Sequence, residues 1–286
     1  MIDFLPAPRM DEVCRSFCQK NLSFRTTRAM NMTINNIQVI LTAAGYATRF
    51  TPWSYIMPKE MLPVYNGSFF VPAIQYVFEQ LYDLGLRDFV IVIRKNKDAI
   101  VNHFSIDWSY VNMLTKKEKY KEAERLAGLF KKIEDSRIQF VTQKYEGFGG
   151  AVLSAKDVID KDKVFIVAPD MIIDLKYIPK DNAIFVSYSN EPQKYGVVQI
   201  STDFRVVEII EKPMYPITHY IFLGYALLST RIFDYINSLK PDKNGEIQLT
   251  PAISNFAQNY EVKVEFVDKW FDIGTPESYL EYFKGL

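Results

Sequence analysis

The sequence is poor in the residues that build disulfide frameworks and metal clusters. It contains 2 cysteines and 2 histidines among 286 residues. Cys14 and Cys18 lie together near the start, so they cannot form a disulfide framework, and no further Cys or His lies nearby to complete a zinc site. His103 and His219 have no partner at metal-ligand spacing. We therefore expect both histidines to be structural.

The chain also lacks a long apolar run and an excess of either charge. Lys plus Arg and Asp plus Glu are balanced at 34 each, so no net field points to nucleic acid or to an anionic membrane. No stretch of about eighteen apolar residues could span a bilayer. The first residues lack the continuous apolar segment of a secretory signal. These absences predict a cytoplasmic protein that binds neither nucleic acid nor a membrane.

Several common catalytic motifs are missing as well. There is no G-x-S-x-G nucleophile turn, no Walker A loop and no G-x-G-x-x-G dinucleotide fingerprint. No hexapeptide repeat is present, which excludes a β-helix domain of that kind. Hydrolases of the G-x-S-x-G type, P-loop enzymes and dinucleotide-binding oxidoreductases are thus disfavoured.

The chain does show alternating strand and helix patterns. Short apolar runs typical of buried parallel strands occur at 39–41, 89–93, 138–141 and 164–168. Helical periodicity separates them, at 73–84, 97–104 and 151–159. The alternation predicts an α/β fold, a Rossmann-like and mostly parallel mixed sheet with helices on both faces.

The remaining segments add detail to this domain. Residues 108–135 are rich in Lys and Glu with helical spacing, which predicts a helix or helical hairpin lying over the domain. Strand patterns at 183–188, 194–198, 206–213 and 222–225 predict a small β subregion. Residues 1–36 lie outside the pattern. We expect them to form a poorly ordered extension that precedes one domain at 37–286.

The first strand leads into a turn of small residues followed by two cations. The turn reads AAGYATR and includes Ala44, Gly45 and Arg49, and Lys59 follows ten residues later. Small residues let the backbone approach a polyphosphate, and Arg and Lys add charge-assisted bonds to it. These residues predict a nucleoside triphosphate site. An ordinary turn with basic residues nearby is the alternative.

Together, AGYATRF and the downstream PKEMLP resemble the signature of the sugar-1-phosphate nucleotidylyltransferases. The family pattern is A-G-x-G-T-R, so Ala47 stands where a second glycine is usual. A methyl group there is expected to narrow the phosphate cradle. The resemblance covers 37–283, with six or more motifs in the expected order. Their order makes it more specific than any one motif.

The resemblance implies roles for residues along the chain. For catalysis it implies that Arg49 and Lys59 hold the triphosphate and Lys212 holds the sugar phosphate. The other implied residues fall into three groups: nucleotide contacts at Ala44, Gly45, Gln143 and Gly147, sugar contacts at Tyr195, Gly196, Glu211 and Gly224, and Mg²⁺ ligands at Asp170 and Asp272.

Some of these assignments also have a direct physical reading. A Gln143 amide offers a donor and an acceptor side by side, which suits the O4 and N3–H edge of uracil or thymine. Asp170 follows an apolar strand, and ligands bind at the carboxyl ends of such strands. Ordinary turns would explain both sites equally, and a surface Glu-Lys pair would explain Glu211 and Lys212. Thr250 is expected to cap the helix that it opens.

The implied reaction is transfer of a nucleotidyl group to a sugar 1-phosphate. The features PKEMLP, the charged insertion and GEIQLTPAI are most similar to members that use UTP and glucose 1-phosphate. Thymidylyl transfer from dTTP, or a non-catalytic nucleotide-sugar-binding protein, are the alternatives. Homo-oligomerisation stays open. Because two aspartates repel without a metal, replacing either by Asn is expected to preserve or raise the melting temperature.

Overall fold

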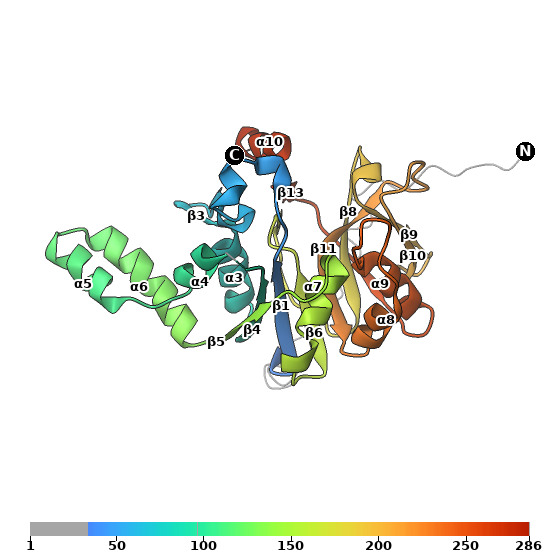
Figure 1. The fold of residues 1–286 in the computed structure, drawn as a ribbon, viewed down its shortest axis with the longest axis horizontal. Helices are drawn as coiled ribbons and strands as arrows, with labels where there is room; N and C mark the ends of the chain where they lie inside the picture. Colours follow the sequence, from blue (N-terminus) through green and yellow to red (C-terminus); the bar gives the residue numbers. More distant parts are fainter. Residues whose placement is uncertain (1–33, 96, 286) are drawn as a thin grey trace, which may run out of the picture.

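Strand β1 (Ile37–Ala43) is the centre of the main sheet. The computed structural model describes residues 34–95 and 97–285, and Figure 1 shows β1 rising through the middle of the molecule. It pairs in parallel with β4 (Asp88–Ile93) on one side and with β6 (Lys163–Val167) on the other. Strand β5 (Arg137–Thr142) adds in parallel beyond β4. The apolar runs of β1, β4 and β6 are buried on both faces of the sheet, whereas β5 at the edge has no buried residue.

The other half of the sheet is built around antiparallel pairs. The long strand β11 (Tyr220–Ser229) runs antiparallel to β6, and β8 (Ala183–Tyr188) and β9 (Gly196–Ile200) pair with β11. Strand β10 (Val206–Glu211) completes a hairpin with β9, and β12 (Lys263–Phe266) pairs in parallel with β8. The predicted mixed α/β sheet is confirmed, and the small β subregion lies at this edge.

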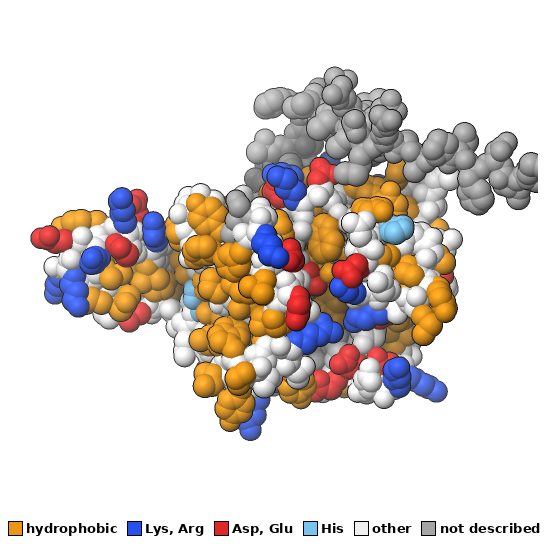
Figure 2. Space-filling view, turned by 90° about the horizontal axis from the view of Figure 1, so that it is seen from above, with side chains coloured by type: hydrophobic (Ala, Val, Ile, Leu, Met, Phe, Trp, Pro, Cys, Tyr) orange, Lys and Arg blue, Asp and Glu red, His pale blue; other side chains and the backbone are white. Residues whose placement is uncertain are grey.

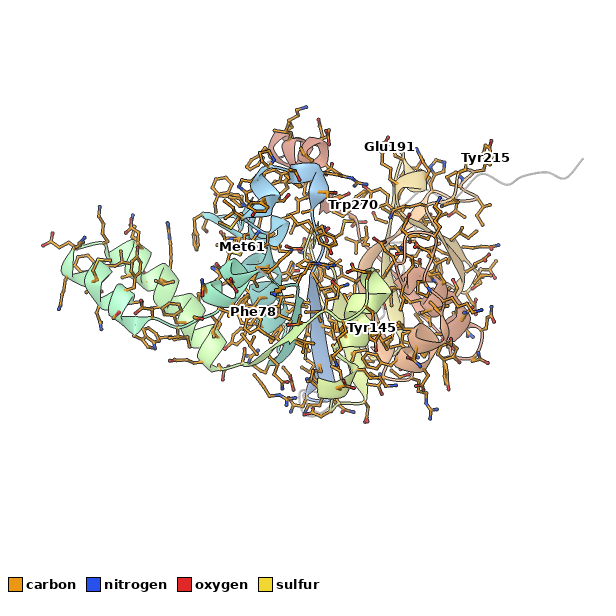
Figure 3. All side chains as sticks on the ribbon, in the orientation of Figure 1. Met61, Phe78, Tyr145, Glu191, Tyr215 and Trp270 are labelled. Carbon is orange, nitrogen blue, oxygen red and sulfur yellow. The ribbon has the colours of Figure 1, made fainter. Side chains whose placement is uncertain are left out.

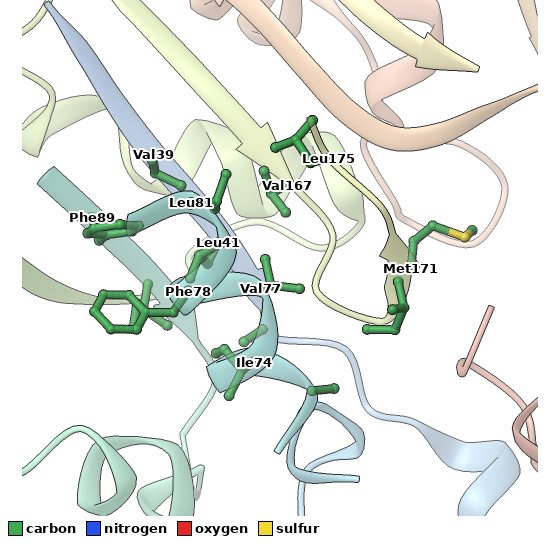
Figure 4. Packing of buried hydrophobic residues seen from close by; sticks show 14 of the residues in the cluster. Val39, Leu41, Ile74, Val77, Phe78, Leu81, Phe89, Val167, Met171 and Leu175 are labelled. Atoms are coloured by element: carbon green, nitrogen blue, oxygen red, sulfur yellow. The ribbon is translucent and has the colours of Figure 1, made fainter. Parts of the chain in front are cut away.

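Helices cover one face of the sheet with a large apolar core. Helix α3 (Ala73–Asp83) packs Ile74, Val77 and Phe78 against β1 and β4, where they meet Val39 and Leu41, as Figure 4 shows. Buried side chains of other helices join this core: α4 (Asp98–His103), α5 (Trp108–Lys116), α6 (Tyr120–Glu134) and α10 (Pro276–Lys284).

The predicted insertion is a helical hairpin made of α5 and α6. Trp108 packs edge-on against Phe130, and its indole nitrogen donates a 2.8 Å hydrogen bond to Glu134. The hairpin was expected to lie over the domain, but Figure 1 shows its tip projecting away from the sheet. Its many Lys and Glu side chains favour solvent over a packed face, which explains the difference.

The opposite face of the sheet carries α7 (Phe148–Ser154), α8 (Ile232–Ser238) and α9 (Leu249–Ala257). The sequence predicted α7 at 151–159, but it begins earlier, directly after Gly147 with φ 88°. The two helices α8 and α9 are seen at the right of Figure 1. Apolar cores cover both faces of the sheet, so the ends of its strands are the places left open for a site.

Two small sheets frame the carboxyl ends of the parallel strands. Strand β7 (Met171–Ile173) pairs with β13 (Trp270–Asp272), and β2 (Pro63–Tyr65) pairs with β3 (Phe70–Pro72). The Tyr282 hydroxyl of α10 accepts a 2.7 Å hydrogen bond from the backbone N–H of Tyr65. The C-terminal helix thereby fastens the loops above β1.

Residues just before 37 also contact the domain. Ile34 packs against the core, and the Asn36 side chain donates a 2.6 Å hydrogen bond to Asp162. The expectation of poor order for residues 1–33 lies outside the described residues. Within the described part of the chain, no helix is long and apolar enough to cross a bilayer.

Candidate active site

A cleft of about 410 Å³ lies where the loops following β1, β4, β5 and β6 come together. Seen from above in Figure 2, this side of the molecule carries acidic and basic side chains close together. Every residue that the sequence analysis assigned to the site lines the cleft: Arg49, Lys59, Lys212, Ala44, Gly45, Gln143, Gly147, Tyr195, Gly196, Glu211, Gly224, Asp170 and Asp272. The fold thus gathers motifs that are spread along the sequence.

The turn after β1 carries the departure from the family pattern. Ala47 has φ 51° and ψ 39°, a left-handed conformation that glycine adopts at little cost. Its carbonyl accepts a hydrogen bond from Phe50 N–H, which closes the short 3₁₀ turn η1 (Thr48–Phe50). Arg49 on this turn is exposed and lines the cleft. The alanine therefore keeps a backbone shape that suits glycine.

Lys59 and Asp170 form an ion pair inside the cleft, with the lysine Nζ on Oδ2 of the carboxylate. Their side chains are only 18% and 24% exposed. Burial alone would lower the pKa of Lys59, but Asp170, and then Glu60, raise it above its usual value. Burial likewise works to raise the pKa of Asp170, yet Lys59 outweighs it and holds that pKa below its usual value.

A second ion pair fixes the turn that presents Lys59. The next residue, Glu60, is 1% exposed, and its Oε2 accepts a 2.8 Å bond from Lys97 Nζ. Lys97 comes from the segment before α4. This pair ties the turn η3 (Lys59–Met61) to a neighbouring loop and so limits where the Lys59 amine can reach.

Asp272 meets Asp170 at the same point. Its Oδ1 accepts a 2.7 Å bond from Gly274 N–H, and its Oδ2 accepts a 3.1 Å bond from the Tyr195 hydroxyl. A Cβ built on Gly274 would lie 2.9 Å from Asp272 Oδ1 and 3.3 Å from Asp170 Oδ2. Burial, followed by repulsion from Asp170, raises the pKa of Asp272 above its usual value.

The two carboxylates are a suitable donor set for a magnesium ion. Mg²⁺ prefers one or two carboxylates together with substrate phosphates and water. Among residues 34–95 and 97–285, no group of three or more His, Cys, Asp or Glu side chains could hold a metal. The raised pKa of Asp272 indicates that a cation would relieve its repulsion from Asp170.

The predicted base segment follows β5. Gly147 has φ 88°, and a Cβ there would lie 2.5 Å from the Ile247 carbonyl oxygen, so only glycine fits. The Gln143 side-chain nitrogen donates to the carbonyls of Tyr145 at 2.6 Å and Gly147 at 3.3 Å. Figure 3 shows Tyr145 beside α7. The amide nitrogen is therefore committed to its own turn, which leaves only the oxygen to face a base, in place of the predicted donor and acceptor side by side.

The predicted sugar residues line the other end of the cleft. Gly224 has φ 74°, and a Cβ on it would lie 2.8 Å from the Ala168 methyl group. Lys212 also has a positive φ, 43°, and its Nζ lies 3.0 Å from Glu211 Oε1. The Thr250 hydroxyl donates a 2.9 Å bond to Glu211 Oε2.

Thr250 therefore does not cap its helix, contrary to the prediction. The N-terminal cap of α9 is Gln248, and Thr250 lies inside the first turn. Its hydroxyl donates to Glu211 instead. Because the two residues are far apart in the chain, local sequence cannot reveal this contact.

Sequence reasoning missed Arg94, whose side chain makes more hydrogen bonds than that of any predicted residue of the cleft. Its guanidinium bonds to both oxygens of Glu146, at 2.9 and 2.6 Å, and to the Ala44 carbonyl at 2.9 Å. It also lies 3.7 Å from the centre of the Tyr46 ring. The available signal was its place directly after the buried strand β4, at the carboxyl end of a parallel strand.

Comparison with known proteins decides the family. A model described as "Nucleotidyl transferase" matches residues 37–286. The chain belongs to the nucleotidyl transferase family. It is 33% identical over 267 residues to a UTP–glucose-1-phosphate uridylyltransferase of Pseudomonas aeruginosa, a match that covers 85% of this chain and 92% of that protein. The predicted family is confirmed.

Solved structures give the same family and fold. A UDP-glucose pyrophosphorylase complexed with UDP-glucose matches with a TM-score of 0.73 and 25% identity, over 87% of this chain and 97% of the other. A UTP-bound enzyme of this type from Acinetobacter baumannii has the same TM-score and identity, over 87% and 92%. This nucleotidyl transferase thus has the fold of nucleotide-diphospho-sugar transferases.

Proposed function

We propose that this nucleotidyl transferase transfers a uridylyl group from UTP to glucose 1-phosphate, giving UDP-glucose and pyrophosphate. Relatives with this activity in their names match most of the chain, among them the Pseudomonas aeruginosa protein. The single observation that carries the proposal is the meeting of Lys59, Asp170 and Asp272 in one cleft behind the turn after β1. The proposal retains the expectation of a cytoplasmic enzyme.

The chemistry requires positioning more than covalent participation. An oxygen of the sugar phosphate attacks the α-phosphorus of UTP in line, the bond from that phosphorus to the bridging oxygen breaks, and pyrophosphate leaves. Arg49 and Lys59 would bind the triphosphate and the leaving pyrophosphate, and Lys212 would hold the attacking phosphate. When bound between Asp170 and Asp272, Mg²⁺ would supply charge neutralisation for the phosphates.

The glycine contacts support the proposed division of the cleft. At Gly147 and Gly224 the backbone is so close to neighbouring groups that a side chain would collide. In our proposal the backbone of two segments approaches the nucleotide: the turn after β1 at Ala44 and Gly45, and the segment after β5 at Gly147. Gly224 and Gly196, with Tyr195 and Glu211, would approach the sugar.

The direct test is release of pyrophosphate from UTP and glucose 1-phosphate in the presence of Mg²⁺. We expect turnover with UTP that needs both the sugar phosphate and Mg²⁺. A higher kcat/KM with dTTP would make the chain a thymidylyltransferase instead. Equal turnover with GTP would exclude a pyrimidine site, and binding of UTP without any turnover would favour the non-catalytic alternative.

A further inference from the structure

We propose that Arg94 sets the nucleobase selectivity of the cleft by holding the Gln143 amide in one orientation. The inference rests on the proposed function, because it assumes that Gln143 meets the base. Arg94 would be a positioning residue, since it acts on the base through another side chain. Its guanidinium nitrogen Nη2 donates to Gln143 Oε1 at 3.2 Å.

Both ends of the Gln143 amide have partners that forbid a flip. Its nitrogen donates to two backbone carbonyls, those of Tyr145 and Gly147, and its oxygen accepts from Arg94. After a flip, the NH₂ group would face the guanidinium donors and the oxygen would face two carbonyl oxygens. Neither encounter can form a hydrogen bond. The amide is thereby locked.

The locked amide has one remaining capacity for hydrogen bonding. Its nitrogen has two hydrogens, and both are used. Its oxygen has two lone pairs, and Arg94 takes one. Gln143 can then only accept from a base. Cytosine also carries a donor on this edge, its N4–H₂ group, so the inference places the Gln143 oxygen opposite ring position 3 of the base. There uracil and thymine carry an N–H donor, whereas the N3 of cytosine is an acceptor.

Arg94 is itself held in place by three groups around it. Glu146 binds it through two parallel hydrogen bonds, the Ala44 carbonyl accepts from Nε, and the Tyr46 hydroxyl accepts from Nη1 at 2.7 Å. Paired carboxylate contacts fix the plane of a guanidinium. The Arg94 side chain thus joins the turn after β1 to the base segment after β5, and its orientation is transmitted to Gln143.

The test is the ratio of kcat/KM for UTP to that for CTP in Arg94→Met. Without the guanidinium, the contact of the amide oxygen that opposes a flip is lost, while the Tyr145 and Gly147 carbonyls still oppose it. The flipped amide, which would offer its NH₂ group to cytosine N3, is then less strongly disfavoured, and we expect the ratio to fall by up to about tenfold. A purely structural role would lower both values together and leave the ratio unchanged.

Arg87→Met provides the matched control. Arg87 has similar partners, with Asp135 at 2.8 Å and the Tyr82 ring at 3.6 Å, but it is not among the residues that line the cleft. Its removal should leave the UTP to CTP ratio at the wild-type value. In Gln143→Ala, adding Arg94→Met should change the ratio no further, because the amide that Arg94 positions is already gone.

The outcomes separate this inference from the proposed function. If the wild type fails to turn over UTP, the proposed function fails, and the ratio of UTP to CTP dissociation constants from calorimetry still tests Arg94. An unchanged ratio in Arg94→Met overturns the inference. Should that variant not fold, Arg94→Lys replaces it, because one ammonium cannot reproduce the planar set of contacts. A lower ratio is again expected, and an unchanged one overturns the inference.

Discussion

Ala47 places a methyl group in the turn after β1, at a position where the family pattern has glycine. Its φ of 51° costs an alanine about 1–2 kcal/mol relative to its preferred regions, whereas glycine adopts it readily. Glycine in turn loses more chain entropy on folding, roughly 0.5–1 kcal/mol. The second effect offsets only part of the first, and the turn keeps the shape that the family pattern requires at a small net cost.

We therefore expect Ala47→Gly to raise the free energy of unfolding by no more than about 1.5 kcal/mol. The KM for UTP should stay within about twofold, because the backbone already has the required conformation. Urea unfolding and steady-state kinetics measure the two quantities. A tenfold drop in KM would show that the methyl group obstructs the phosphates after all.

Asp170 and Asp272 are not equivalent, although the sequence predicted the same effect on the melting temperature for replacing either by Asn. Lys59 stabilises the charged form of Asp170, whereas the charged form of Asp272 is opposed by burial and by Asp170. Asp170→Asn should lower the free energy of unfolding by about 1.5–3 kcal/mol, since it leaves the Lys59 charge largely buried and unpaired. Asp272→Asn should preserve or raise stability, because repulsion is removed.

Thermal unfolding without metal compares the two variants, and turnover with Mg²⁺ is measured alongside. We expect both to lose activity by orders of magnitude, since each would remove a proposed metal ligand. A loss of stability in Asp272→Asn equal to that in Asp170→Asn would contradict the assignment of the charges. Near wild-type turnover in either variant would exclude that aspartate from the metal site.

Among the elements, strands and helices with strong periodicity were predictable, and those shaped by distant contacts were not. The runs behind β1, β4 and β6 are buried on both faces and follow the sequence pattern closely. The prediction that Thr250 caps α9 was wrong, because its hydroxyl donates to Glu211 at the end of β10. A local window of sequence contains no trace of such a contact.

The site follows the same division. Motifs such as AGYATR and PKEMLP identify cations and small residues because their order along the chain is informative. Arg94 has no motif, and its function as inferred depends on Glu146 and Gln143, which lie 52 and 49 residues away. Position at the end of a parallel strand was the only sequence signal for it.

On the scale of the whole molecule, each end of the cleft contains its own internal charge pairs. Lys59 pairs with Asp170, Arg94 with Glu146 and Lys212 with Glu211. The chain has no net charge, and these pairs repeat that balance locally. In the proposed mechanism, the phosphates of the substrates would replace the carboxylates as partners of Lys59 and Lys212, and a divalent cation would compensate the charges of Asp170 and Asp272.

His103 makes the free energy of unfolding depend on pH. It is the last residue of α4, and its ring packs edge-on against Phe104. Its Nε2 is buried without a partner in the described structure, and burial lowers its pKa to about 4. In the unfolded chain the pKa is about 6.5. The unfolded state therefore takes up a proton first as the pH falls, so stability present above pH 6.5 is lost on the way to pH 4.

Between pH 7 and pH 5 this group should cost the folded state about 1–2 kcal/mol, and the lowered pKa of Asp170 adds a loss only at more acidic pH. His103→Leu has no titrating group at position 103, so its free energy of unfolding should fall less steeply over the same pH range. Urea unfolding of both proteins at several pH values measures the difference in slope. Equal slopes would mean that His103 titrates in the folded protein as it does in the unfolded chain, and that its burial is not what resists protonation.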